Sequence, residues 1–299
     1  MKIKLSFVWL LAMVLSISGF AKEISVLTIG NSFANSVFDY LPKVVESAGD
    51  KIILERANIG GCSLERHWRE LEKSEADPTH KPYDKKFNLR EKLESCKWDY
   101  VTIQQVSTFS WQAESYEPYA SNLCKYIEKY APGAEIVMHQ TWAYRFDDGR
   151  LKRWKMEQRE MYERLTGAYN KIAAELKLRV IPSGDAVQLA RETQATPYVP
   201  YDPETLKNLK YPAALPSEKG SFVRGLRWTK DKNSGEYKIG GDSSHLNKRG
   251  EYLQACVWYA FFFEKPTSEI KFVPAVVDGD DAEFLRQTAQ KALDARRQK

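Results

Sequence analysis

The chain has 299 residues, of which 43% are hydrophobic and 28% charged, which is the balance of a soluble globular chain. This length excludes a peptide-sized fold that depends on disulfides. The formal net charge is +5 and basic and acidic residues are interleaved, which excludes a surface that tracks phosphates, so we expect no nucleic-acid partner.

The N-terminus has the pattern of a signal peptide. Lys2 and Lys4 precede the apolar run 5–17, and Gly19-Phe20-Ala21 puts small residues at the two positions that a signal peptidase reads. The run is too short to cross a hydrocarbon core of about 30 Å as a helix, so we expect no stable membrane insertion. The sequence therefore predicts cleavage near Ala21, a periplasmic or secreted protein, and one mature domain over 22–299.

Apolar runs alternate with helical patterns along the first part of the mature chain. We expect strands at 24–30, 52–57, 98–104, 135–139 and 179–182, and helices at 37–48, 63–73, 116–130 and 153–176. This alternation predicts an α/β fold, a three-layer α/β/α sandwich around a parallel sheet, with catalytic loops at the carboxyl ends of the strands.

The alternation stops at about 194–240, where prolines are frequent and periodicity is low. Residues 231–235 predict the turn of a hairpin within this segment. We interpret the segment as a lid insertion over the functional site, and the alternative is a passive surface excursion. Helical patterns return at 248–263 and in an exposed C-terminal helix at 281–297.

Several common catalytic and cofactor motifs do not occur in the sequence, among them GxGxxG, the Walker loop, HExxH and GxSxG. The histidines are far apart in the sequence, so we expect no metal centre and no cofactor; they are His67, His80, His139 and His245. We expect the first two of them to be solvated. None of the cysteines has the spacing of a zinc site, and we favour free thiols over disulfides; they are Cys62, Cys96, Cys124 and Cys256.

Two segments carry the residue types of a serine hydrolase. Asp242 precedes His245 by three residues in a glycine-containing tight turn, where its carboxylate can orient Nδ1–H and leave Nε2 free for a nucleophile. Ser32 follows the first predicted strand on the loop into the next helix, whose N-terminus offers free N–H groups to an anionic intermediate. The alternatives are a helix-capping Asp beside a surface His, and a serine that serves only as an N-cap.

Together these segments resemble the SGNH (GDSL-like) hydrolase superfamily, in which an N-terminal serine works with a C-terminal DxxH. The segments Ile-Gly-Asn-Ser-Phe, Gly-Gly-Cys-Ser-Leu-Glu, Ile-Gln-Gln-Val-Ser and His-Gln-Thr-Trp-Ala-Tyr look like its DUF4886-type branch, and the resemblance covers about 24–263. It implies that Ser32 is the nucleophile, His245 the base and Asp242 its orienting partner. It also implies that the amides of Ser32 and Gly61 are oxyanion donors, although Gly61 alone would predict only a turn after a strand.

The sequence departs from the superfamily pattern at two places. Asn31 stands where the superfamily usually has Asp, and no GxND segment supplies the usual oxyanion asparagine. We expect the side-chain amide of Gln105, in preference to Gln104, to serve as that donor; the alternative is a glutamine that satisfies loop backbone groups.

Another predicted strand ends at 139, so the polar and aromatic residues that follow it are candidates for the pocket wall. His139, Gln140 and Trp142 are these candidates, and Trp142 could pack on a sugar face. Core filling by Trp142 is the alternative.

The resemblance and the predicted export together imply an exported serine esterase that acts through an acyl-enzyme without metal or cofactor. We expect a carbohydrate esterase that removes acetyl groups from a polysaccharide, by analogy. The alternatives are esterases of lipids, small acyl esters or methyl esters, and a catalytically silent glycan-binding module of the same fold.

Overall fold

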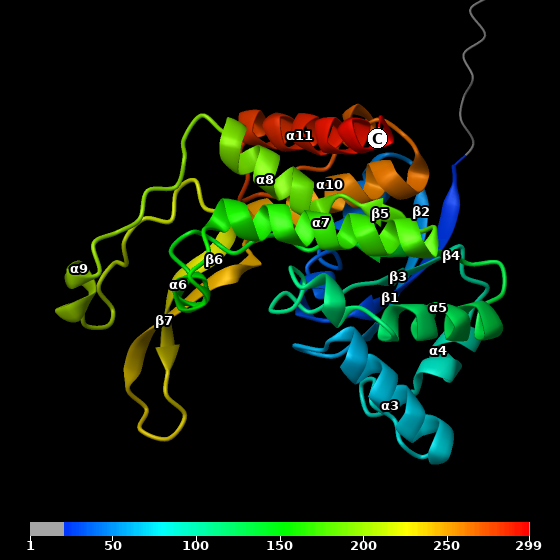
Figure 1. Cartoon of the computed structure of the whole chain (residues 1–299). Coiled ribbons are helices and arrows are strands. Elements are labelled where there is room, and N and C mark those ends of the chain that lie inside the picture. Colours follow the sequence, from blue (N-terminus) through cyan, green and yellow to red (C-terminus); the bar gives the residue numbers. More distant parts are fainter. Residues whose placement is uncertain (1–20, 299) are drawn as a thin grey trace, which may run out of the picture.

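A computed structural model of the chain describes residues 21–298, shown in Figure 1. The predicted signal sequence lies outside the described residues, except for Ala21 at its end. Within the described part, no helix is both long and apolar enough to cross a membrane.

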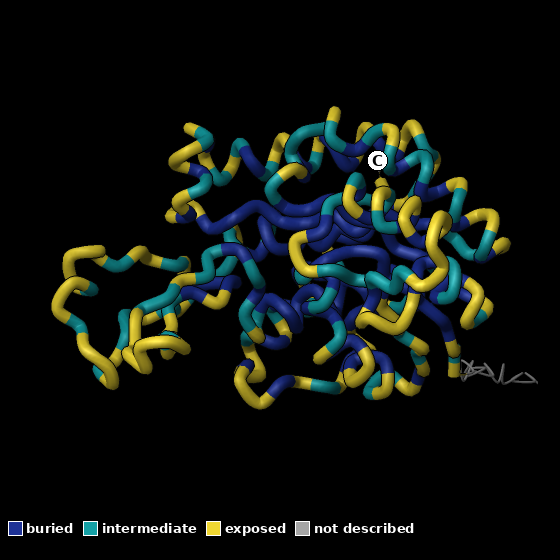
Figure 2. The backbone as a smooth tube through the Cα atoms, turned by 90° about the horizontal axis from the view of Figure 1, so that it is seen from below, coloured by how far each residue is buried: buried dark blue, intermediate teal, exposed yellow. Residues whose placement is uncertain are grey.

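The core of the molecule is a five-stranded parallel sheet in the order β2-β1-β3-β4-β5. Its strands are β1 (Glu23–Gly30), β2 (Lys51–Asn58), β3 (Tyr100–Ile103), β4 (Glu135–His139) and β5 (Arg179–Ile181). Because all five strands run the same way, their carboxyl ends lie at one edge, and Gly30 is paired with Asn58 there. Figure 2 shows the buried sheet at the centre of the molecule.

Helices cover both faces of this sheet, so the predicted three-layer α/β/α sandwich is confirmed. On one face α10 packs against α2, α8 and α11, and on the other α5 packs against α3 and α4 (Figure 1). The helices are α1 (Ser32–Asn35), α2 (Leu41–Ser47), α3 (Leu64–Ala76), α4 (Leu89–Glu94), α5 (Tyr119–Tyr130), α6 (Gly149–Trp154), α7 (Gln158–Leu176), α8 (Ser183–Thr193), α9 (Glu204–Lys207), α10 (Lys248–Phe263) and α11 (Gly279–Arg297), with short 3₁₀ turns at Ala113–Ser115 and Thr267–Glu269.

Several helices differ from the sequence prediction. The helix predicted at 153–176 is two helices, α6 and α7, because the backbone turns into the left-handed region at Lys155, with φ of 52°. The helices α4 and α8 were not predicted. A capping box of Asn88 and Glu91 begins α4, and this sequence signal would have located it.

The segment predicted as an insertion projects from the body in Figures 1 and 2. It contains α9 and leads into an antiparallel hairpin of β6 (Val223–Lys230) and β7 (Tyr237–Leu246). The carboxylate of Asp231 accepts the N–H groups of Asn233 and Ser234 at 2.9 and 3.0 Å and so closes the predicted turn. However, β7 continues beyond 240, so the predicted turn around Asp242 is wrong: this residue lies inside a strand.

A buried arginine joins the base of the insertion to the body. The guanidinium of Arg145 donates to both carboxylate oxygens of Asp147, at 2.6 and 2.9 Å, and forms an ion pair with Glu218. It also donates to Ser221 Oγ at 3.2 Å and lies 4.0 Å from the ring centroid of Tyr198. The insertion is therefore held at its base by charge-assisted bonds.

The cysteines are free thiols, as predicted, and three of the four are buried. Burial raises the pKa of the Cys62, Cys124 and Cys256 thiols to about 12. A thiol with so high a pKa is a poor nucleophile at neutral pH.

Candidate active site

Ser32 lies at the carboxyl edge of the sheet, where β1 ends and α1 begins. The N-cap of α1 is Asn31, whose Oδ1 accepts the N–H of Phe33 at 3.0 Å, so the alternative that Ser32 serves as the cap is wrong. The helix predicted at 37–48 is present as α2 (Leu41–Ser47), and the short α1, with 4 residues, precedes it and follows Asn31 directly. The dipole of α1 is therefore small, and the local N–H groups are what this loop offers an anion.

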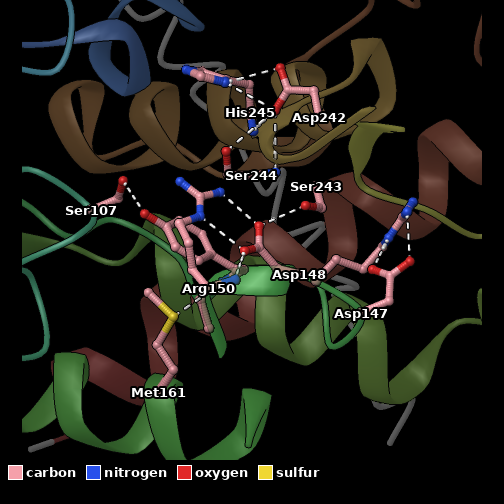
Figure 3. A network of polar contacts seen from close by, with 12 residues as sticks. Ser107, Asp147, Asp148, Arg150, Met161, Asp242, Ser243, Ser244 and His245 are labelled. Carbon is pink, nitrogen blue, oxygen red and sulfur yellow. Dashed lines mark hydrogen bonds and ion pairs between the residues drawn. The ribbon is translucent and has the colours of Figure 1, made fainter. Parts of the chain in front are cut away.

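The three residues predicted as a triad lie together, although Ser32 and His245 are 213 positions apart. Ser32 Oγ is 2.8 Å from His245 Nε2. On the other side of the ring, His245 Nδ1 is 3.1 and 3.0 Å from the two carboxylate oxygens of Asp242 (Figure 3). This is hydrogen-bond contact along the whole path from hydroxyl to carboxylate.

The carboxylate of Asp242 is held by its own strand. Its Oδ1 accepts the backbone N–H of His245 at 3.0 Å and that of Ser244 at 3.3 Å. Burial alone would raise the pKa of Asp242, but these N–H groups and the imidazole keep it below its ordinary value. The N-cap of α10 is Asn247, so the alternative reading of Asp242 as a helix cap is wrong.

Aromatic packing fixes the imidazole from behind. The ring of Phe33 lies 5.3 Å from that of His245, edge to face, and stacks on Trp142 at 4.2 Å. The indole of Trp142 donates to the carbonyl of Ser244 at 2.7 Å. Trp142 is fully buried, so its predicted place in the pocket wall is wrong and the core alternative is right.

Contacts of β7 with the loop after β4 continue beyond Trp142. Ser243 Oγ donates to Asp148 at 2.6 Å, and Arg150 donates to the two oxygens of the same carboxylate at 2.9 and 2.7 Å (Figure 3). The N–H of Arg145 donates to the carbonyl of Ser243 at 3.0 Å. The strand that carries the imidazole is thus attached to the body at Ser243 and Ser244.

The predicted oxyanion donor Gly61 lies in an exposed turn after β2, beside the nucleophile loop. Its φ is +62°, a conformation that glycine adopts without strain. Asn31 Nδ2 donates to the carbonyl of Cys62 at 3.0 Å and ties this turn to the loop of Ser32. The role of the Ser32 and Gly61 amides as oxyanion donors stays a prediction.

The structure contradicts the role predicted for Gln105. Its side-chain N–H groups donate to the carbonyl and hydroxyl of Ser115 at 2.9 and 3.1 Å, and its Oε1 accepts the N–H groups of Leu64 and Val106. The alternative that this glutamine satisfies loop backbone groups is therefore right, and it has no N–H left for an oxyanion.

Two further predicted pocket residues are also buried and engaged. Gln104 donates to Asn31 Oδ1 at 3.0 Å, and Gln140 donates to Asp185 at 2.7 Å and to Thr166 at 3.1 Å. Their predicted contact with substrate is wrong, because buried amides with satisfied hydrogen bonds do not reach a ligand.

The remaining histidines lie outside the triad. The prediction that His67 is solvated is wrong: its ring is buried and lies 3.0 Å from Tyr83 Oη and 2.9 Å from the carbonyl of Gly30. Burial lowers its pKa to about 4. His80 is partly exposed and contacts Glu70 at 2.6 Å. Both are on the α3 side of the sheet.

Sequence reasoning missed three residues that contact the triad or its loops. Phe33 packs on the imidazole, Arg227 lies 3.8 Å from the Asp242 carboxylate, and Gln254 lies 3.4 Å from the carbonyl of Phe33. A signal existed for Gln254, since it is a lone amide on the otherwise apolar part of α10.

The triad opens to solvent, and the imidazole of His245 is 32% exposed. Cavities of about 180 to 540 Å³ open elsewhere on residues 21–298, and none of these is lined by Ser32, Asp242 or His245. In the same part of the chain, no cluster of three or more His, Cys, Asp or Glu side chains could hold a metal ion. A polar nucleophile and a base thus meet where the imidazole reaches solvent.

Comparison with known families gives one match over most of the chain. The family model DUF4886, a domain of unknown function, matches residues 25–200. No curated protein matches the chain.

Among solved structures, the chain is similar to a DUF4886 family protein from Bacteroides uniformis ATCC 8492. The two share 26% identity, with a TM-score of 0.69 over 91% of this chain and 95% of that one. A lipase/acylhydrolase from Enterococcus faecalis is 13% identical, with a TM-score of 0.47 over 84% of this chain and 100% of that one. An acetyl xylan esterase is 12% identical, with a TM-score of 0.45 over 80% and 100%. The last two likenesses are too low to argue from.

Proposed function

The chain belongs to the DUF4886 family, whose name assigns no activity, and we propose from the site itself that it is a serine esterase. One observation carries the proposal: Ser32 Oγ lies 2.8 Å from His245 Nε2 while Asp242 faces the opposite nitrogen at 3.0 Å. A hydroxyl, an imidazole and a partly buried carboxylate in this order are the parts needed for nucleophilic acyl transfer.

In the proposed reaction Ser32 Oγ attacks the ester carbonyl as His245 Nε2 takes its proton. Asp242 keeps Nδ1 as the protonated nitrogen and stabilises the imidazolium. The tetrahedral oxyanion is held by N–H groups of the Ser32 loop and the Gly61 turn. His245 then gives its proton to the departing alcohol. Water, deprotonated by the same nitrogen, cleaves the acyl-enzyme and restores the serine.

We propose an ester on a glycan as the substrate, acetyl esters in particular. The exposure of the base supports this: the imidazole of His245 is 32% exposed, so an acyl group that projects from a polymer can reach it without burial of the rest of that polymer. The insertion also exposes aromatic rings: Tyr211, which precedes the hairpin, and Tyr237, at the turn end of β7, stack at 3.7 Å and are 50% and 39% exposed. Such rings can pack on sugar faces.

We also propose that the chain is exported and that its mature form begins after Ala21. The lysines, apolar run and small residues of the first 21 positions support export. Expression of the full chain in a bacterium and N-terminal sequencing of the extracytoplasmic product test this. Lys22 is the expected first residue, and a cytoplasmic product that starts at Met1 would overturn the proposal.

The test of the nucleophile is labelling with a fluorophosphonate followed by peptide mass spectrometry. We expect label on the tryptic peptide 23–43 of the mature chain, loss of label in Ser32→Ala and retention in Ser36→Ala. Ser36 is a matched control because it lies in the same peptide and its Oγ donates to the carbonyl of Phe33 at 2.6 Å. Label on any other serine would overturn the assignment.

Turnover distinguishes the esterase from a silent glycan-binding module. We expect the mature protein to release acetate from acetylated xylan and to hydrolyse p-nitrophenyl acetate, with both activities lost in Ser32→Ala. Equal rates for the wild type and Ser32→Ala would exclude the esterase. Binding of the polysaccharide without release of acetate would favour the module, and cleavage of methyl or long-chain esters in place of acetates would reassign the substrate.

A further inference from the structure

A chain of buried polar side chains lies beneath the nucleophile loop. It runs from Gln254 of α10 to His139 at the end of β4, to Gln104 after β3, and to Asn31 beside Ser32. The linking distances are 3.0 Å (Gln254 Nε2 to His139 Nε2), 3.1 Å (His139 Nδ1 to Gln104 Oε1) and 3.0 Å (Gln104 Nε2 to Asn31 Oδ1). All four side chains belong to residues that are at most 2% exposed. The chain connects four separate elements inside the protein.

Backbone groups at both ends fix the direction of these hydrogen bonds. Asn31 Nδ2 faces the carbonyl of Cys62, and a carbonyl can only accept. Asn31 Oδ1 faces the N–H of Phe33, which can only donate. At the other end, Gln254 Nε2 faces the carbonyl of Phe33 at 3.4 Å and therefore also donates.

With both ends fixed, the middle has one solution. Gln104 donates to Asn31 through Nε2, so its Oε1 accepts from His139 Nδ1. His139 Nε2 in turn accepts from Gln254. The imidazole is therefore neutral, with its hydrogen on Nδ1. Burial supports this assignment, because it lowers the pKa of His139 to about 3.

No titratable side chain contacts this imidazole within the described residues. Its neighbours are the two glutamines and two indoles, with ring centroids 4.9 Å away for Trp258 and 6.4 Å away for Trp142. In a protonated ring Nε2 would also carry a hydrogen, and it would face the donating amide N–H of Gln254. Two donors cannot bond to each other, so that contact would be lost. The chain of hydrogen bonds thus depends on one protonation state and one tautomer.

Asn31 is the point where this chain meets the candidate active site. Asn31 Oδ1 caps α1 by accepting the N–H of Phe33, and this contact fixes the backbone N–H of Ser32 just before it. Asn31 Nδ2 donates to the carbonyl of Cys62, directly after the Gly61 turn. An aspartate could accept at Oδ1 but could not donate to Cys62, and this accounts for the asparagine here. Gly30 is needed as well, since a Cβ on it would lie 2.6 Å from Gln104 Oε1.

We propose that His139 is a positioning residue: through Gln104 and Asn31, its Nδ1–H orients the nucleophile loop and the Gly61 turn as one unit. This inference rests on the proposed function, because the geometry it maintains is that of the oxyanion donors. The residue does not touch substrate, so its effect falls on the acylation rate and not on binding.

Two substitutions divide the contacts of the ring. In His139→Asn the amide nitrogen takes the place of Nδ1 and still donates to Gln104, whereas in His139→Gln the terminal amide takes the place of Nε2 and that donor is lost. We expect kcat for p-nitrophenyl acetate to fall about tenfold or more in His139→Gln, with KM changed less than about twofold, and to fall clearly less in His139→Asn. Equal losses in the two variants at equal melting temperatures would overturn the proposal.

A spectroscopic measurement tests the tautomer without any turnover. In wild-type protein labelled with ¹⁵N-histidine, we expect one ring, absent from His139→Asn, to carry its hydrogen on Nδ1 and to stay neutral between about pH 5 and pH 8. A hydrogen on Nε2, or titration of that ring in this range, would overturn the proposal. If the enzyme fails to label with fluorophosphonate while the ring shows the Nδ1–H form, the esterase fails and the hydrogen-bond chain stands.

Discussion

The substitution Asp242→Asn tests whether the carboxylate orients the base. Asparagine can keep Oδ1 as the acceptor of the His245 and Ser244 N–H groups, which lie 3.0 and 3.3 Å away. In the variant the amide nitrogen takes the place of Oδ2, which in the wild type lies 3.0 Å from His245 Nδ1. The NH₂ group at that position competes with Oδ1, which lies 3.1 Å from the same nitrogen, and it favours the tautomer with hydrogen on Nε2. In that tautomer the nitrogen that faces Ser32 donates and cannot accept its proton.

The structure sets the size of the effect. At a separation of about 4 Å between charge centres, a carboxylate stabilises an imidazolium by about 4 kcal/mol at the effective dielectric of a site near the surface. This corresponds to about a thousandfold in kcat. The reversed tautomer adds to the loss, and in a protease with a Ser-His-Asp triad the equivalent change lowers kcat by about 10⁴. We expect a fall in kcat between about 10³ and 10⁴ with a small change in KM.

Hydrolysis of p-nitrophenyl acetate by wild type, Asp242→Asn and Asp231→Asn measures this. Asp231 is a matched control because it lies on the same hairpin, in the turn, and far along the strand from the triad. We expect wild-type kcat in Asp231→Asn. If Asp242→Asn kept more than about a tenth of wild-type kcat while Ser32→Ala had none, the carboxylate would not orient the base, and the reasoning above would be refuted.

Three further predictions concern the supports of the site. Burial would raise the pKa of Asp148, but the hydrogen bonds from Arg150 outweigh burial and lower this pKa. The Asp148 carboxylate therefore stabilises the fold above about pH 4, and this stabilisation is lost as pH falls through the lowered pKa. The melting temperature of Asp148→Asn should therefore lie furthest below that of the wild type at pH 7, and the gap should narrow as pH falls below about 4; a gap that does not depend on pH would contradict this. The Gly30→Ala variant should not label with the fluorophosphonate, because the added Cβ would lie 2.6 Å from Gln104 Oε1. The control Gly167→Ala should label, because a Cβ there meets nothing within 4 Å. Labelling of both variants would refute the close-packing argument. Arg145→Met should cost about 1.5 to 3 kcal/mol in urea unfolding, because it removes the charge-assisted bonds of a buried guanidinium to two partly exposed carboxylates, and a loss below about 1 kcal/mol would show that these bonds add little.

The sheet was predictable because its strands are short apolar runs whose position in the sequence follows from burial. The runs at 24–30 and 135–139 match β1 and β4 to within one residue. Family membership was predictable too, from four short segments, and the match to DUF4886 confirms it. Such signals are local, and a local pattern is what one sequence can show.

Side-chain roles at the ends of the strands were less predictable. Gln104 and Gln105 are adjacent amides after the same strand, yet neither reaches the surface of the site. Which amide is exposed depends on partners such as Ser115 and Asn31, and these come from other segments of the chain. Residue type and spacing do not encode such a choice, because the hydrogen-bond partners are set by tertiary packing.

Tertiary packing also explains why the sequence predicted the wrong role for the residues at the end of β4. The residues at the end of this strand were assigned to the pocket wall. They lie instead behind the site, where they contact the elements that carry its two parts, the nucleophile loop and the base. His139 connects through Gln104 to the nucleophile loop, and Trp142 connects to the base by its bond to Ser244 and its stack on Phe33.

The end of β4 therefore supports both the Ser32 hydroxyl and the His245 imidazole, which come from opposite ends of the chain. Because β7 carries the base and also forms one strand of the projecting hairpin, movement of the hairpin would reach His245 unless the strand were held. The bonds from the loop after β4 to Ser243 and Ser244 hold it at the two residues directly before His245. We therefore expect any bending of the hairpin beyond Asp242 to leave the 2.8 Å contact between Ser32 and His245 unchanged.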